Sequence, residues 1–142
     1  MPARALVLLE EASGAAEEDS LRSRAEHLRG LTMIWTGGAE TAADLLVVEA
    51  ERAVPRDPQH AAAMFADAAA ACAALGQCHR TLALAERAAA LLGDGGDPPT
   101  RAHVLAVLSW GLVLRGQTRR ARPVLNEVER LAAAIDPLSP AA

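Results

Sequence analysis

The chain has 142 residues and a formal net charge of −4, and 51% of its residues are apolar although only 2% are aromatic. This length is that of one domain, and the negative charge argues against sequence-independent binding to nucleic acid, which needs clustered positive charge. The longest strongly apolar stretch, 104–114, has 11 residues, fewer than the roughly 20 that span a bilayer. Since the first residues also lack the long apolar region of a secretory signal, we expect a cytoplasmic protein without a membrane span.

Helical periodicity predicts the first three elements of the chain. A short helix over 3–13 has no partner before it, so we expect it to be the trailing helix of a preceding unit. A helix up to about residue 35 and a second over 39–54 lie on either side of Gly37-Gly38, where glycine permits a tight turn. Together these two helices form a first hairpin over 17–55.

Two Asp-Pro pairs predict the starts of the next two hairpins. In each pair the aspartate suits the N-cap and the proline suits the first helical position, where its missing amide proton costs nothing. The second hairpin is therefore expected over 57–93 and the third over 97–135. Pro123 falls within the closing helix, which is expected either to start near Arg122 or to kink at the proline.

The spacing of these signals repeats with a period of about 40 residues. Asp-Pro pairs begin at 57, 97 and 136, and Gly-Gln pairs begin at 76 and 116. Such a period is typical of stacked helical arrays, in which no unit can bury its own apolar face. The sequence predicts an all-α, tetratricopeptide-like solenoid of antiparallel helical hairpins with roughly seven helices, forming a single domain over 1–142. Residues 136–142 are interpreted as the start of a further unit or as a tail.

Small residues recur midway along the first helix of each hairpin, at Gly30, Ala69 and Ser109, each seven positions before a turn glycine. This pattern resembles that of tetratricopeptide repeats, in which small residues let helices pack closely. The run from Leu21 to Gly30 and the Ala-Arg-Pro-Val-Leu sequence at 121–125 further resemble the helical-repeat region of large ATP-binding LuxR-type transcriptional regulators. In that family the repeats lie between an N-terminal ATPase module and a C-terminal helix-turn-helix.

The resemblance to LuxR-type regulators implies a connecting or sensing segment that relays the binding of an inducer or partner. The chain contains neither a phosphate-binding loop nor a basic recognition helix, so direct contact with nucleic acid is not expected of this segment. The alternative interpretation is a free-standing adaptor that binds a peptide or a helix. Because half-units stand at both ends, self-association through open ends of the solenoid is a further expectation.

The resemblance to tetratricopeptide arrays also implies a partner-binding surface. In such arrays the first helix of every hairpin lines a concave face, to which the middle hairpin here contributes only alanines. Tryptophan is both a frequent interface anchor and a frequent core residue, so both roles stay open for the two tryptophans. The partner-binding residues implied for this face are Arg24, His27, Leu31, Trp35, His103 and Trp110.

A cluster of arginines at the last turn is a second candidate site. It could contact an acidic partner, a helix C-terminus or neighbouring acidic side chains. The cluster consists of Arg115, Arg119, Arg120 and Arg122. No nucleophile motif, metal-ligand spacing of histidines or cofactor motif occurs in the sequence, so we expect neither an enzyme nor a bound metal or cofactor.

Overall fold

The computed structural model describes residues 2–16 and 18–134, and within these ranges it contains only helices and no strand. The prediction of an all-α fold is therefore confirmed for the described part of the chain. The predictions for residues 135–142, including the third Asp-Pro pair, lie outside it. The helices are α1 (Pro2–Ala15), α2 (Asp19–Trp35), α3 (Ala39–Ala53), α4 (Pro58–Ala74), α5 (Cys78–Leu92), α6 (Pro98–Leu114) and α7 (Thr118–Ala134).

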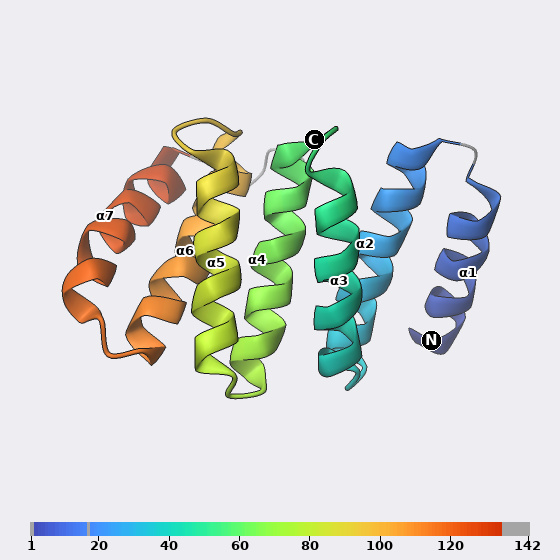
Figure 1. Ribbon diagram of the computed structural model, residues 1–142, viewed down its shortest axis with the longest axis horizontal. Coiled ribbons are helices and arrows are strands. Elements are labelled where there is room, and N and C mark those ends of the chain that lie inside the picture. Colours follow the sequence, from blue (N-terminus) through green and yellow to red (C-terminus); the bar gives the residue numbers. More distant parts are fainter. Residues whose placement is uncertain (1, 17, 135–142) are drawn as a thin grey trace.

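The helices pack side by side in chain order, and consecutive helices run in opposite directions (Figure 1). In addition, α4 contacts both α2 and α6, whereas the backbones of α3, α5 and α7 do not approach one another closely within the described ranges. Helices α2, α4 and α6 therefore form one row, here called the inner row. The remaining helices, α1, α3, α5 and α7, form an outer row, in which wider spaces separate the neighbours.

Side-chain caps start helices α4 and α6 where the Asp-Pro pairs predict them. The carboxylate of Asp57 accepts a hydrogen bond from the amide of His60 at 2.9 Å, and Asp97 accepts one from the amide of Thr100 at 2.9 Å. The side chain of Gln59 also exchanges hydrogen bonds with Asp97, accepting from its amide at 3.2 Å. These contacts join the start of α4 to the start of α6.

The core is centred on α4, which packs against four other helices. Its largest buried side chains, Phe65 and Met64, are surrounded by alanines of the same helix. The small residues predicted at the crossings, Gly30, Ala69 and Ser109, are all buried. At Gly30 the approach is so close that an added Cβ would lie 2.6 Å from Leu46 Cδ2 of α3. The small residues therefore set the helix spacing.

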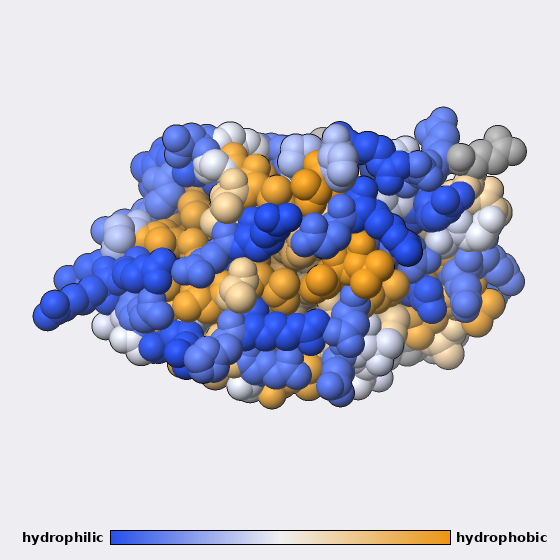
Figure 2. All heavy atoms as spheres, in the orientation of Figure 1, coloured by the Kyte–Doolittle hydropathy of each residue, from blue (hydrophilic) through white to orange (hydrophobic). Residues whose placement is uncertain are grey.

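Ion pairs connect the outer helices across the spaces between them. They join α3 to α5 and α5 to α7, and the arginine of one pair, Arg87, also lies with its Cζ 5.9 Å from the centre of the buried Phe65 ring. Hydrophilic bands cross an apolar area in Figure 2, which is viewed as in Figure 1. Exposed pairs of this kind contribute about 0.2–1 kcal/mol each, so the core dominates stability. The pairs are Asp44–Arg80, Glu51–Arg87 and Glu86–Arg120.

Two helix boundaries differ from those predicted. Helix α1 continues through Gly14 to Ala15, although a glycine stop was expected after residue 13, because this glycine keeps a helical backbone. Helix α7 begins at Thr118 and contains Pro123, so the start near Arg122 is wrong, while the alternative of a kink at the proline stays a prediction. Pro123 lies beyond the first turn, so the helix loses the hydrogen bond that an amide there would donate to the carbonyl of Arg119, and the proline ring crowds that carbonyl. None of the described helices is long and apolar enough to cross a membrane.

Replacement of Gly30 tests the close approach of α2 and α3. We expect Gly30→Ala to destabilise the chain by about 1–3 kcal/mol, because the new methyl group overlaps the fully buried Leu46 side chain. Gly14→Ala is the matched control, since no atom lies within 4 Å of a Cβ added there, and it should stabilise by about 0.5–1 kcal/mol. Urea unfolding followed by circular dichroism measures both, and equal effects would contradict the packing.

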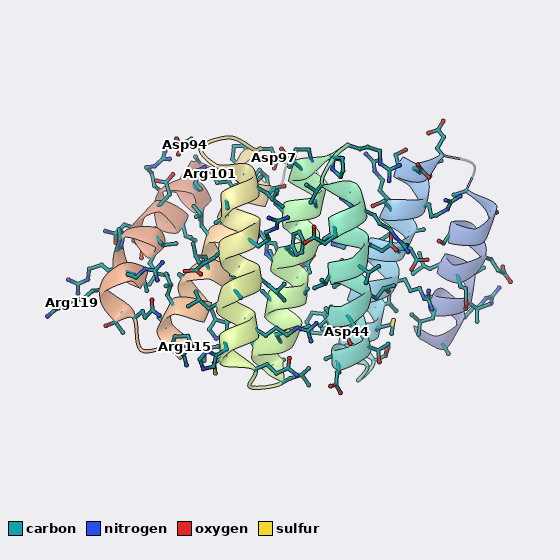
Figure 3. The ribbon with its side chains drawn as sticks, viewed as in Figure 1. Asp44, Asp94, Asp97, Arg101, Arg115 and Arg119 are labelled. Carbon is teal, nitrogen blue, oxygen red and sulfur yellow. The ribbon has the colours of Figure 1, made fainter. Side chains whose placement is uncertain are left out.

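Replacement of Asp97 tests the junction between the second and third hairpins. Asp97→Ala should cost about 1–2 kcal/mol in urea unfolding, because the variant loses the cap of α6 and the contacts with Gln59. Asp94→Ala, in the same loop (Figure 3), should change stability by less than about 0.5 kcal/mol, since Asp94 is exposed. A loss of stability in Asp94→Ala as large as that in Asp97→Ala would argue against this cap.

Candidate functional site

The inner row leaves one strip of α4 uncovered. The strip follows helical spacing through Ala63, Asp67, Ala70 and Ala74, which are partly or fully exposed while most of α4 is buried. Asp67 is the one acidic residue of α4. We call this strip, together with the neighbouring exposed side chains of α2 and α6, the inner face.

Two histidines from neighbouring helices meet on Asp67. The Nε2 atom of His27 on α2 lies 2.7 Å from Asp67 Oδ2, and the Nε2 atom of His103 on α6 lies 2.9 Å from Asp67 Oδ1. The side chains of His27 and Asp67 are each 15% exposed, and that of His103 is 42% exposed. One carboxylate thus connects all three helices of the inner row.

The two contacts shift the pKa values of Asp67 and His103. Burial by itself would raise the pKa of Asp67, but the hydrogen bonds from His103 and His27 outweigh burial and lower it. The hydrogen bond to Asp67 raises the pKa of His103 against the opposing effect of burial. Both shifts favour a charged pair, carboxylate with imidazolium.

A third histidine, His60, lies beside this group and behaves in the opposite way. Its ring stands edge-on to that of His27, with the ring centres 5.0 Å apart. Burial, followed by the charge of His27, lowers the pKa of His60, and its buried Nε2 atom has no hydrogen-bond partner in the part of the chain that the structure describes. These effects favour the neutral form of His60. Among the described residues, no group of three His, Cys, Asp or Glu side chains is placed to hold a metal ion.

Apolar side chains surround this polar centre. Trp35 is 87% exposed at the end of α2, and Trp110 is 44% exposed on α6, so neither tryptophan is a core residue. Leu28 is 53% exposed at the position of α2 that corresponds to Asp67 in the repeat, and Leu31 is partly buried one turn further. The predicted residue Arg24 is also exposed. The inner face is therefore an alanine strip between exposed apolar side chains.

The four arginines predicted as a second site do not form one group. Arg120 forms an ion pair with Glu86 at 2.9 Å. Contact with a neighbouring acidic side chain is one of the three roles left open for this cluster. Arg122 lines a hollow between α6 and α7 with Leu125 and Glu129. Arg115 and Arg119 form no ion pair within residues 18–134, and Figure 3 shows Arg119 pointing outward from α7, away from Arg115 at the end of α6.

The sequence prediction placed His27 and His103 on the same face but missed the residue that joins them. Asp67 follows His27 by 40 residues and precedes His103 by 36, about one repeat in each direction. It is also an isolated acid within an alanine-rich helix. These two signals together could have identified it.

Comparisons with known proteins give no further assignment. No protein-family model, no curated protein and no solved structure matches the chain. The tetratricopeptide-like and LuxR-type resemblances therefore stay predictions, and the function is argued from the inner face.

Replacement of His103 gives a pH-dependent change in stability. Because its pKa is raised in the folded state, His103 stabilises the fold below its ordinary pKa of 6.5, and this contribution is lost as the pH rises through the raised value. The difference in unfolding free energy between wild type and His103→Gln should therefore be largest near about pH 5.5 and shrink towards about pH 8.5. Urea unfolding at several pH values measures it. His79→Gln, at an exposed position, is the control, and a difference that did not vary with pH would contradict the pairing.

Proposed function

We propose that the chain is a non-catalytic helical-repeat module that binds a peptide or a helix of a partner protein on its inner face. The observation that carries the proposal is the exposure of Trp35 and Trp110 on the same row of helices. Tryptophan is enriched among the residues that contribute most to protein interfaces.

The composition of the inner face supports this proposal. Exposed Leu28, Trp35 and Trp110 offer apolar area that a partner could cover. The alanines of α4 between them are short, so a partner's backbone can approach closely. Asp67, with its two histidines, supplies a polar contact at the centre that can orient the partner.

The wider setting that we propose is a LuxR-type transcriptional regulator of the large ATP-binding class. There the module would act in the cytoplasm and relay the binding of a partner or inducer to neighbouring domains. The repeat period and the small residues at the crossings support this setting, as does the resemblance of 21–30 and 121–125 to that family. The alternative is a free-standing adaptor with the same inner face. Sequencing of the complete gene decides between them, because only the first setting requires encoded ATPase and helix-turn-helix domains.

Selection from a peptide display library on the immobilised chain tests the binding proposal. We expect Trp110→Ala to weaken the selected peptides about tenfold or more, because a central tryptophan anchor is lost. Isothermal titration calorimetry on purified peptides measures the affinity.

The matched control for Trp110→Ala is Val48→Ala, which removes a half-exposed apolar side chain from α3 in the outer row. It should change the affinity less than about twofold. Peptides that bind Trp110→Ala and Trp35→Ala as tightly as wild type, but lose affinity with Val48→Ala, would move the binding surface to the outer row.

A further inference from the structure

The histidine–aspartate group is the one polar link that touches all three inner helices within the described residues. We propose that His27, Asp67 and His103 form a proton-operated clasp that holds α2 and α6 against α4 and so makes binding on the inner face depend on pH. The clasp itself follows from the geometry; its effect on binding rests on the proposed function.

The two oxygens of the Asp67 carboxylate make separate contacts, one to each neighbouring helix. Asp67 Oδ2 contacts His27 of α2, and Asp67 Oδ1 contacts His103 of α6. A neutral imidazole can donate from Nε2 only in one tautomer, whereas an imidazolium donates from both nitrogens. Because Asp67 is a carboxylate, a neutral histidine that donates from Nε2 already makes a charge-assisted hydrogen bond, and protonation of the ring converts that bond into an ion pair between opposite charges.

Water is largely excluded from His27 and Asp67, so solvent screens the charges in this part of the clasp only weakly. The side chains of His27 and Asp67 are mostly buried, and the uncovered strip of α4 around them is otherwise alanine. Charges interact more strongly where water is excluded. His103 is 42% exposed, so gain or loss of a proton on its ring alters an attraction between α6 and α4 that water partly screens.

Other ionisable groups lie around the clasp on α2 and α4. On α2, the positive charge of Arg24 helps to lower the pKa of His60, and the buried Glu26 forms an ion pair with Arg29. On α4, burial lowers the pKa of His60, while Asp57 at the helix start acts in the opposite direction.

Helices α3 and α5 pack against the buried side of α4 and direct their charges elsewhere. The pairs Asp44–Arg80 and Glu51–Arg87 join α3 to α5, and the buried Glu49 of α3 pairs with Arg52 of the same helix. On α6, Arg101 approaches Glu127 of α7 at 3.7 Å. Asp67 is therefore the acidic side chain that contacts both His27 and His103 within the described residues.

The direction of the effect follows from these charges. Below neutral pH the protonated His103 forms an ion pair with Asp67, which holds α6 on α4 and fixes the position of Trp110 relative to the alanine strip. Above neutral pH this ion pair is reduced to a hydrogen bond, and α6 can separate from α4 at this point. A partner that contacts both α2 and α6 should therefore bind more tightly at mildly acidic pH.

The clasp is tested first without any partner, by a nuclear magnetic resonance titration of the histidine ring protons. Replacement of Asp67 by Asn should move the titration of His103 to lower pH, whereas the exposed His79 should titrate as in wild type. An unchanged titration of His103 would overturn the clasp. Far-UV circular dichroism establishes that Asp67→Asn is folded.

The effect on binding is tested with the peptides selected by display, at about pH 5.5 and about pH 8. Wild type should bind about fivefold or more tightly at the lower pH, a typical size for coupling between two sites. His103→Gln, at a part-exposed position that does not risk the fold, should lose most of this difference, and it serves as the second variant if Asp67→Asn does not fold.

The outcomes separate the two proposals. A shifted His103 titration with pH-independent peptide binding would overturn the coupling while leaving the binding proposal intact. Failure to select any peptide would overturn the proposed function and the coupling with it, whereas the titration shift would still establish the clasp.

Discussion

Close contact between helices at small side chains is the constraint on which the rest of the structure depends. Helix α4 touches four other helices, and its alanines are buried on every side except one strip. Gly30 brings α2 within reach of Leu46, and an added Cβ at Gly111 of α6 would lie 3.2 Å from the Leu82 backbone of α5. With larger residues at these crossings the inner row would spread, and Asp67 could not contact α2 and α6 together. Packing therefore determines the polar centre of the inner face.

A buried carboxylate needs partners, because a charge without them is costly in a medium of low polarity. Asp67 has two, and both come from other helices rather than from its own. The core is apolar and tolerates many combinations of side chains, whereas this group requires α2, α4 and α6 in one register. We interpret it as the element that makes the spacing of the inner row specific and sensitive to protonation. The exposed tryptophans lie on helices whose spacing it controls.

Local signals in the sequence predicted most of the fold. Asp97-Pro98 caps a helix because the carboxylate and the proline ring act within one turn, and Gly76 adopts a positive φ of 72° at the predicted turn. The predictions that were wrong or incomplete failed for physical reasons. Gly14 remains helical because a glycine permits a stop without requiring one, and α7 continues through Pro123 although the proline removes one backbone hydrogen bond. Asp67 was missed because its partners lie about one repeat away on either side, and that pairing depends on how the helices pack.

The most direct test of this account is a double-mutant cycle between Asp67 and His103 in urea unfolding at about pH 6, with Asp67→Asn, His103→Gln and the double variant. Since the two side chains touch and His103 is part-exposed, the account predicts a coupling energy of about 0.5–1 kcal/mol that decreases towards about pH 8.5. Additive effects at both pH values would show that the two residues do not act together, and would contradict the link between the inner helices.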